Sequence, residues 1–495
     1  PAASSTLTPE DTTRLELVAW QHKGFGLAPY EAYKSIRLNR PAEKPARPLF
    51  KEHARAGEVV DKQLGRGLAA RIPLALFSEN GQTIRPDDTP SLNHLKKKLD
   101  SIAVDSLTAK NELVRYADVI IGWNILQHFY PYFEVVEADW ERVLRQSLVH
   151  ASSDQSPDEF LETLKRMLVP LKDGHALVVP PVDVDQYARF PFTLRWVEEK
   201  LIITEVHASA EGKSCFQKGD VISSINESPA EQWIREKKKL ISGSPQWKTA
   251  SALRRLVYGL GETYTFELSR SGQNLTCTVT QQSDINIKFE QPGPVEELQD
   301  DIYYVDLRNA SMKTIRKKVD TLAAAEGVIF DVRGIPNGNH DVLRHLSDDT
   351  LRSPRWMIPQ IIYPDRVDIA GHDTSGRWTL EPKPPRFTGK SVFLSNKRTI
   401  SYGESVMGIV EHYELGEIIG ETTAGANGNV ASYGLPGEYK IRWTGMKVLK
   451  HDYAQHHLVG IQPTIAVEPT IEDVREGRDS YIEKAIEVIH SSIEN

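Results

Sequence analysis

Residues 391–404 read SVFLSNKRTISYGE, and this stretch decides the fold because it joins a buried strand to a helix through a short polar turn. The apolar run 391–395 is typical of a strand that is covered on both faces. The helix is predicted to begin near Tyr402, which places Ser401 at its N-terminus, where unpaired amides and the helix dipole stabilise negative charge. A serine at this position usually caps the helix. The segment alone therefore leaves the role of Ser401 open.

The alternation of strand and helix continues on both sides of this stretch. Continuous apolar strands that alternate with helices predict a parallel or mixed sheet with helices on both faces. Residues 298–495 are therefore predicted to form the main α/β core. Strands are expected at 303–307, 327–332, 391–395 and 417–420, and helices at 312–325, at 339–348, from 402 onward and at 478–492.

The rest of the chain divides into three further regions. Residues 188–285 are predicted to form a separate unit of short strands, with a helix near 229–241. Residues 96–187 are helical and lead, through a turn after Pro170, into an apolar strand of the first part of the core. Residues 1–95 are mixed and interrupted by prolines, which disfavour helices, and we describe them as an accessory N-terminal region. The predicted fold class is a multidomain α/β (α+β) protein.

Charge and composition exclude several classes of protein. The chain has a net charge of -8 with acids and bases interleaved, whereas a nucleic-acid surface clusters Lys and Arg. No uncharged apolar stretch approaches the roughly 20 residues that cross a bilayer, so no integral membrane segment is expected. With only Cys215 and Cys277, we expect neither a disulfide framework nor a metal cluster, and no other cofactor. Two unpaired thiols are the simpler interpretation, and one disulfide is the alternative.

Two further turns carry residues suited to catalysis. Residues 331–339 read DVRGIPNGN and directly follow a buried strand. Ligands bind at the carboxyl ends of such strands, and glycine lets backbone amides approach an anion closely. Residues 173–175, Asp-Gly-His, form a tight turn that opens an apolar strand. A histidine near neutral pH takes the proton that a serine hydroxyl must lose to become a nucleophile.

The chain resembles the tail-specific, or C-terminal-processing, serine peptidases over residues 110–490, and within them the tricorn-core type. Six segments match motifs of this family in the family's order. They are Leu171–His175 (the Asp-Gly-His turn), Lys218–Asn226 (similar to GDxIxxING of PDZ domains), Asp331–Gly338 (DxRGNPGG), Thr399–Glu404 (TASASE), Gly420–Gly425 (GExTxG) and Val459–Pro463 (GVGIxPD).

The resemblance implies a ClpP/crotonase-like α/β core with an inserted PDZ-like domain, and a serine endopeptidase that cleaves peptides or unfolded protein segments. In the family's pattern Ser401 is the nucleophile, His175 is the general base, and the amides of Gly338 and Tyr402 form the oxyanion hole. Many members carry a lysine base where this chain has Ala426, so a Ser-Lys dyad is excluded.

Several points stay open in this comparison of motifs. The group that orients His175 is unassigned, with Glu404, Glu421 and His457 as the candidates. The family implies an extracytoplasmic location, periplasmic or secreted, in a bacterium, and the sequence leaves the oligomeric state open. The alternatives are a non-catalytic protein that binds peptides or apolar ligands on the same core, and an esterase-like hydrolase. The presence of both Ser401 and His175 favours the enzyme, and the PDZ-like insert, unless it only shapes the cleft, disfavours the esterase.

Overall fold

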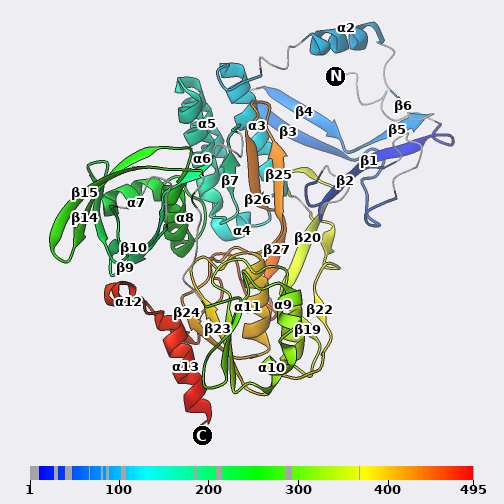
Figure 1. Cartoon of the computed structure of the whole chain (residues 1–495). Helices are drawn as coiled ribbons and strands as arrows, with labels where there is room; N and C mark the ends of the chain where they lie inside the picture. Colours follow the sequence, from blue (N-terminus) through cyan, green and yellow to red (C-terminus); the bar gives the residue numbers. More distant parts are fainter. Residues whose placement is uncertain are drawn as a thin grey trace. The chain divides into compact units, whose positions relative to one another are not determined.

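Figure 1 shows the fold of the chain, taken from a computed structural model. The structure describes residues 11–26, 32–38, 47–65, 67–79, 82–84, 89–101, 107–182, 187–207, 215–283, 285, 292–366 and 368–493. The chain divides into two compact units, each assembled from segments that are distant in the sequence. The first comprises Pro1–Leu164, Trp356–Gly376 and Asn429–Lys447, and the second Lys165–Arg355, Arg377–Gly428 and Val448–Asn495.

The first unit combines an antiparallel sheet with helices. The sheet has the order β21-β20-β1-β5-β6, with β2 paired to β1. Helices α3 and α5 pack together where the rings of Trp123 and Trp140 stack with centroids 6.2 Å apart. The elements are β1 (Glu16–Lys23), β2 (Lys34–Arg37), β3 (Val59–Gly65), β4 (Leu68–Pro73), β5 (Ala75–Glu79), β6 (Gln82–Thr83), α2 (Thr89–Asp100), α3 (Glu112–Phe129), α4 (Phe133–Val136), α5 (Trp140–Ser153), β20 (Arg355–Ile361), η5 (Pro364–Arg366), β21 (Gly371–Asp373), β25 (Val430–Gly434) and β26 (Lys440–Thr444).

The second unit is built around one mostly parallel sheet of order β16-β17-β18-β23-β24-β28. Only the edge strand β16 runs antiparallel to its neighbour. The elements of this core are β16 (Val295–Gln299), β17 (Ile302–Asp306), α9 (Met312–Arg316), α10 (Val319–Ala324), β18 (Gly327–Asp331), η4 (His340–His345), β19 (Leu351–Arg352), β22 (Thr379–Leu380), β23 (Lys390–Ser395), α11 (Tyr402–His412), β24 (Glu417–Gly420), β28 (Ile465–Ala466), α12 (Ile471–Glu476) and α13 (Ser480–Ile493). Four further elements lie outside this sheet. They are α6 (Pro157–Leu168), η2 (Val169–Leu171), β7 (Leu177–Val179) and β27 (Lys447–Leu449).

Helices cover both faces of this sheet, as the alternation of strands and helices predicted. Successive side chains of a strand point to opposite faces. In β23, Phe393 joins the apolar cluster that α11 covers, whereas Val392 and Leu394 join the cluster that α13 covers. All three side chains are fully buried. The mixed α/β fold class is therefore confirmed.

Two of the predicted helices have a different form. The predicted helix 312–325 is two short helices, α9 and α10, separated at Lys317 and Lys318. The predicted helix 339–348 is the 3-10 helix η4. Short 3-10 segments are common connectors, and here the connection leaves the loop after β18 free of regular α-helix.

Residues 188–283 contain a sheet and an apolar core of their own within the second unit. The order of the sheet is β15-β14-β11-β10-β9, with β12 on β11, and its core contains Phe190, Phe192 and Phe266. The elements are β8 (Ala188–Arg189), β9 (Phe192–Val197), β10 (Lys200–Val206), β11 (Val221–Ile225), β12 (Ser228–Pro229), α7 (Ala230–Lys238), α8 (Pro245–Val257), β13 (Tyr258–Gly259), β14 (Thr263–Arg270) and β15 (Gln273–Thr280). Helix α8 was not predicted from the sequence. The likeness of this insert to a PDZ domain and the predicted domain boundaries stay predictions.

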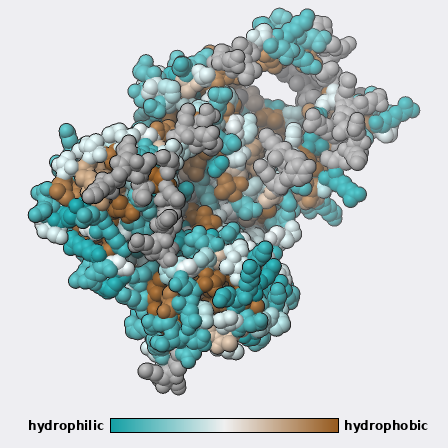
Figure 2. Space-filling model, viewed as in Figure 1, coloured by the Kyte–Doolittle hydropathy of each residue, from teal (hydrophilic) through white to brown (hydrophobic). Residues whose placement is uncertain are grey.

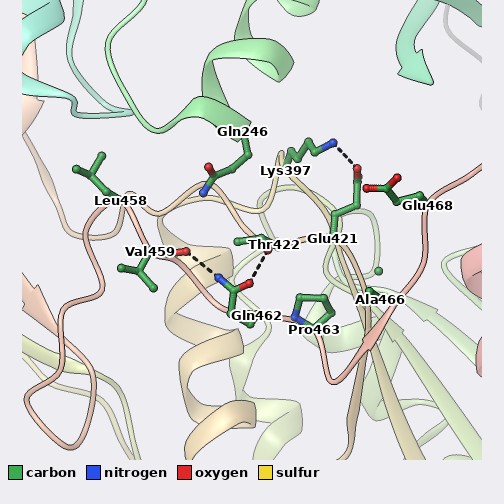
Figure 3. Close-up of a pocket in the computed structure, with 11 residues that line it drawn as sticks. Gln246, Lys397, Glu421, Thr422, Leu458, Val459, Gln462, Pro463, Ala466 and Glu468 are labelled. Atoms are coloured by element: carbon green, nitrogen blue, oxygen red, sulfur yellow. Dashed lines mark hydrogen bonds and ion pairs between the residues drawn. The ribbon is translucent and has the colours of Figure 1, made fainter. Parts of the chain in front are cut away.

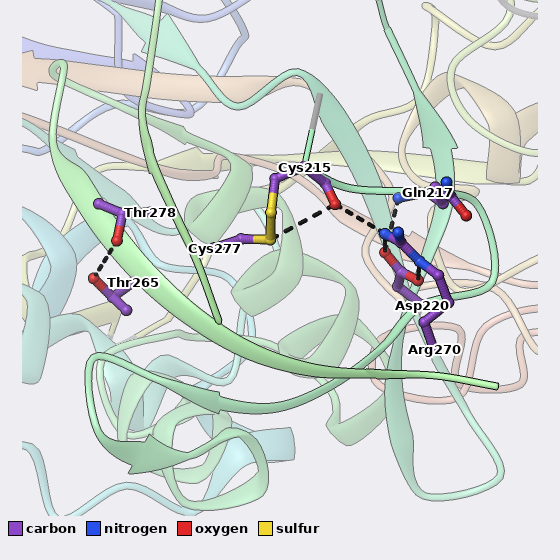
Figure 4. The surroundings of a disulfide bond; sticks show 7 residues. All are labelled: Cys215, Gln217, Asp220, Thr265, Arg270, Cys277 and Thr278. Atoms are coloured by element: carbon purple, nitrogen blue, oxygen red, sulfur yellow. Dashed lines mark hydrogen bonds and ion pairs between the residues drawn. A yellow bond between two sulfur atoms is a disulfide. The ribbon is translucent and has the colours of Figure 1, made fainter. Parts of the chain in front are cut away.

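Cys215 and Cys277 form a disulfide, which corrects the interpretation of two unpaired thiols (Figure 4). The Cys277 side is buried in β15, and the Cys215 side follows residues outside the described chain. The ion pair of Arg270 with Asp220, 2.7 Å long, lies beside the disulfide, since Arg270 also donates to the Cys215 carbonyl. Sequence alone left the pairing open because the two residues are 62 positions apart.

The surface seen in Figure 2 is mostly hydrophilic, with apolar residues in small groups. Scattered exposed apolar side chains are usual on folded proteins. Among the described helices, none has the length and apolar character that spanning a membrane requires.

Candidate active site

Ser401 lies in the sharp connection between β23 and α11. Its backbone has φ 57° and ψ -116°, a region that costs a non-glycine residue of order 1–3 kcal/mol and that is found mostly at functional sites. The Ser401 hydroxyl makes no capping hydrogen bond to α11, so the role of a simple helix cap does not apply. The side chain is partly exposed. A strained strand-to-helix turn that presents a serine hydroxyl is the backbone arrangement of a nucleophile elbow.

The glycine turn after β18 lies against the first turn of α11. A Cβ placed on Gly403 would lie 2.7 Å from the carbonyl oxygen of Gly334. The amide of His340 donates to the Tyr402 hydroxyl at 3.1 Å. Gly338 lies between these two contacts along the loop, with φ +61° and open space where a side chain would be. Because Tyr402 begins α11, its amide has no acceptor within the helix, and the loop that carries Gly338 contacts the first turn of α11 on both sides of Gly338.

His175 follows a tight turn between η2 and β7. Lys172 opens the turn in the left-handed conformation, with φ 48°. The fully buried carboxylate of Asp173 accepts a hydrogen bond from the amide of His175 at 2.9 Å. The same oxygen lies 3.9 Å from Nδ1 of His175, whose side chain is 10% exposed. Asp173 therefore holds the backbone of the turn and places a negative charge beside the imidazole.

The environment of His175 favours the neutral imidazole. Burial lowers the pKa of His175 below its usual value, and the charges of Asp173 and Glu404 act in the opposite direction. A general base must be unprotonated to accept a proton. The environment is therefore compatible with the role of base that was predicted for His175.

Ala426 contacts both the turn of Ser401 and the turn of His175. The amide of Ser401 donates to the Ala426 carbonyl at 2.9 Å. On the other side, a Cβ placed on Gly174 would lie 2.8 Å from the Cβ of Ala426. Ala426 is 1% exposed, so the position has no space for a long side chain. The alanine that replaces the family's lysine therefore packs directly between the Ser401 turn and the His175 turn.

Glu404 acts as an anchor for the loop that contains Ala426. Its fully buried carboxylate accepts hydrogen bonds from the amides of Gly425, at 2.6 Å, and Ala426, at 2.8 Å. The Thr423 hydroxyl donates to it at 2.5 Å, and Nε2 of His456 lies 3.3 Å away. Burial raises the pKa of Glu404, but the charge of His456 and these hydrogen bonds lower it below its usual value. Glu404 is therefore an anion whose two oxygens are engaged by the loop.

The other two candidates for orienting His175 are placed differently. His457 is 1% exposed, and burial lowers its pKa to about 4, opposed mainly by the charge of Asp173. His175 and Glu404 also act on this pKa, so His457 belongs to the same buried cluster. Glu421 instead forms ion pairs with Arg195, at 3.2 Å, and Lys397, at 2.7 Å. These partners engage both of its carboxylate oxygens, so the structure does not place Glu421 as the partner of His175.

The insert contributes residues to the site that the sequence did not reveal. The hydroxyl of Ser242 accepts a hydrogen bond from the buried amide of Asp173 at 2.8 Å. Ser244 caps α8 by accepting from the Trp247 amide, and its hydroxyl donates to the Ala424 carbonyl at 2.7 Å. The segment at the start of α8 therefore contacts both the turn that carries His175 and the loop 424–426 beside Ser401. Ser244-Pro245 is a sequence signal for the start of a helix, so α8 was predictable from the sequence.

A pocket of about 480 Å³ adjoins this loop (Figure 3). Its walls include Gln246 of α8, the residues Gly420–Thr422, and Leu458. The Leu458 amide donates to the Gly425 carbonyl at 2.8 Å, and Gly425 precedes Ala426, whose carbonyl accepts from the Ser401 amide. The lining of the pocket contains both polar and apolar side chains. Within the described part of the chain, no group of three or more His, Cys, Asp or Glu side chains has the arrangement of a metal site.

Comparison with known proteins finds a similar fold and a family profile that matches part of the chain. The profile of peptidase family S41 matches residues 301–467, which contain Ser401 and Gly338. Mature CPAF has a similar structure, with a TM-score of 0.61 and 13% identity over 76% of this chain and 96% of that chain. Mature CPAF complexed with lactacystin gives a TM-score of 0.60 and 14% identity, covering 77% and 99%. The photosystem II D1 C-terminal processing protease gives 0.44 and 15%, covering 72% and 93%.

Comparison with curated protein sequences finds no match. The fold and the family profile define a serine-type peptidase. The match to peptidase family S41 covers residues 301–467 of the core.

Proposed function

We propose that this peptidase cleaves peptides or unfolded protein segments through an acyl-enzyme, with Ser401 as nucleophile and His175 as general base. The single observation that supports this most strongly is Ser401 itself, a strained, partly exposed serine at a helix start that its hydroxyl does not cap. Strain of this kind persists only where the surrounding structure imposes it.

In the proposed mechanism His175 takes the proton of the Ser401 hydroxyl as the oxygen attacks the scissile carbonyl carbon. The oxyanion accepts hydrogen bonds from the amides of Gly338 and Tyr402, which stabilise charge that develops in the transition state. The imidazolium then protonates the leaving amine, and the C–N bond breaks. A water molecule, deprotonated by His175, hydrolyses the acyl-enzyme and returns the enzyme to its starting state.

Asp173 is the proposed orienting group in place of the three candidates taken from the sequence. It is the carboxylate with an ion-pair distance to His175 Nδ1, and it is fully buried, where its charge is screened least. Glu404 supports the same imidazolium through its charge while it holds the Ala426 loop.

We also propose tail-specific selection of substrates, with the PDZ-like insert adding an extended peptide to its sheet edge. An extracytoplasmic location is part of this proposal. The disulfide supports it, because disulfides persist in oxidising compartments.

Labelling with a fluorophosphonate tests the nucleophile. The wild-type protein is expected to be labelled, and Ser401→Ala is expected to abolish labelling. Ser311→Ala is the matched control, because Ser311 also stands at a helix start but caps α9 with its hydroxyl. Labelling that persists in Ser401→Ala contradicts the assignment. Comparing cleavage of unstructured peptides with free and amidated C-termini then tests tail selection.

A further inference from the structure

We infer that Arg398 is a specificity-determining residue that binds a carboxylate of the substrate polypeptide close to the scissile bond. This inference rests on the proposed function, in which Ser401 is the nucleophile. It adds a chemical class of substrate: polypeptides with an acidic group near the bond that is cut.

Arg398 is held close to the nucleophile by the turn between β23 and α11. The Thr399 hydroxyl donates to the Val332 carbonyl at 2.8 Å, and the Arg398 amide donates to the side chain of Asn396 at 2.9 Å. The Arg398 side chain is exposed. Three residues of extended chain span at most about 11 Å, so the Cα atoms of Arg398 and Ser401 lie no farther apart. An extended substrate advances by about 3.3 Å per residue, which places Arg398 within reach of the few residues around the scissile bond.

The carboxyl ends of neighbouring parallel strands carry a cluster of basic residues at this edge. Arg308 follows β17, Arg333 follows β18, and Arg398 follows β23. Arg333 is neutralised by Asp331, at 2.7 Å, and by Asp479, at 2.8 Å.

The other cations of this edge each have a carboxylate partner. Arg308 pairs with Asp306 at 3.4 Å, and Glu421 is shared between Arg195 and Lys397. Among the described residues, no carboxylate forms an ion pair with Arg398. Arg398 is therefore the guanidinium of this edge that is open to a carboxylate of the substrate.

The neighbouring positive charges make this guanidinium a favourable binding site for an anion. Although one side of the Arg398 side chain is exposed, the surrounding protein lowers its pKa, and Arg308, Arg195 and Arg333 lower it further, to about 10. Arg398 is thus still protonated at neutral pH, and an incoming carboxylate relieves the repulsion among the cations. The planar guanidinium matches a carboxylate with two parallel hydrogen bonds. Ligands of open α/β sheets bind at the carboxyl ends of the strands, where this cluster lies.

Matched internally quenched peptides test the inference. A single Glu is moved through the four positions on each side of the scissile bond, and each peptide is compared with its Gln counterpart by kcat/KM. All termini are amidated, and one further Gln peptide has a free C-terminus, which separates a side-chain carboxylate from a terminal one. We expect about a 10-fold to 100-fold preference for the carboxylate at one position, the range of a charge-assisted hydrogen bond.

Substitution of the arginine must remove this preference. Arg398→Gln is expected to lose the advantage of the Glu peptide over the Gln peptide, and Arg398→Glu is expected to favour a Lys peptide. Arg352→Gln, an exposed arginine of the same unit, is expected to keep the wild-type preference. A preference that survives Arg398→Gln, or equal rates for the wild type, overturns the inference while leaving the nucleophile intact. Absence of all cleavage overturns the proposed function and the inference together.

Binding to the inactive Ser401→Ala protein gives an independent measurement. Fluorescence anisotropy of the preferred Glu peptide is expected to show tighter binding than that of the Gln peptide, and the difference is expected to vanish when Arg398→Gln is added. Equal affinities of the two peptides for Ser401→Ala contradict a carboxylate site at Arg398.

Discussion

At the scale of single residues, the backbone of Ser401 links function to stability. An L-residue at φ 57° and ψ -116° is strained, whereas glycine adopts positive φ freely. We therefore expect Ser401→Gly to be more stable than Ser401→Ala by about 1–2 kcal/mol, although neither variant is active. Thermal unfolding of the two proteins measures the difference. At Ser152, in the regular helix α5, the order is expected to reverse, since glycine destabilises a helix relative to alanine. Equal stabilities of Ser401→Gly and Ser401→Ala would contradict backbone strain at this position.

The charge of Asp173 is expected to appear in the pH dependence of catalysis. Asp173 raises the pKa of His175, so Asp173→Asn lowers that pKa, and the acid limb of kcat/KM moves to lower pH. The plateau falls by about 10²-fold or more, because the imidazolium of the transition state loses its partner. The pH-rate profiles of the two proteins test both effects. A lower plateau without a shift of the acid limb would indicate a purely structural role for Asp173, and Asp158→Asn, at an exposed position, is expected to change neither quantity.

The residues of the site were predictable in part from the sequence. Ser401, His175 and Gly338 stand in short motifs that a local pattern identifies. Asp173 stands in one of the same motifs, but its role depends on a side chain that folds back onto the His175 amide, and residue order does not specify that geometry. Glu421 was a reasonable candidate by its motif, yet Arg195 and Lys397, which pair with it, come from distant segments.

At the scale of elements, the start of α8 supports the general base from outside the core. Ser242→Ala removes the acceptor of the buried Asp173 amide, which costs about 1–3 kcal/mol when no other group replaces it. The turn that carries His175 then loses its fixed position, and we expect kcat to fall while labelling by fluorophosphonate slows. Steady-state kinetics and thermal unfolding measure the two effects. Ser223→Ala, at an exposed serine of the same insert, is the control. An unchanged kcat in Ser242→Ala would contradict the role of Ser242 in positioning the His175 turn.

The disulfide is expected to stabilise the insert. Closing a loop with a sequence separation of 62 residues restricts the unfolded chain and is worth up to about 4 kcal/mol. Reductant is therefore expected to lower the temperature at which the insert unfolds, as followed by circular dichroism. A Cys215→Ser, Cys277→Ser double variant is expected to unfold at that lower temperature with and without reductant. A reductant effect of the same size in the double variant would show that the disulfide is not its source.

At the scale of the whole molecule, the alternation of apolar strands and helices along the chain predicted the sheet. It did not predict which distant segments form the candidate site. The parallel strands β17, β18, β23 and β24 are readable as apolar runs, and their parallel order follows from the helices between them. Helix α8 and the turns at 173–175 and 424–426 meet across long separations in sequence, and no local period encodes such a meeting. The resemblance to a family indicated Ser401 as the nucleophile and His175 as the base. A motif gives the residues of a site even though the sequence does not show the contacts between them.

Buried histidines in both units predict how the stability of the molecule depends on pH. Burial lowers the pKa of His22, in the first unit, and of His451 and His457, in the second, each from 6.5 to about 4. Below pH 6.5 the unfolded chain binds protons that the folded chain does not, so the free energy of unfolding falls as the pH falls from 6.5 to about 4. For the fully buried His457 this amounts to roughly 3 kcal/mol. Carboxylates with lowered pKa values, such as Asp331 at about 2, lose their contribution only at still lower pH.

Thermal unfolding at a series of pH values tests this dependence, and the proton uptake on unfolding measures its cause. His457→Gln is expected to flatten the dependence between pH 6.5 and 4, because glutamine has no proton to gain on unfolding. His94→Gln, a substitution at an exposed histidine of α2, is the control. A free energy of unfolding that stays constant across this window would mean that the three imidazoles accept protons in the folded protein. Burial in the core would then not be enough to keep an imidazole neutral. The neutral form of His175 that the mechanism needs would have to be stabilised by the residues of its own turn.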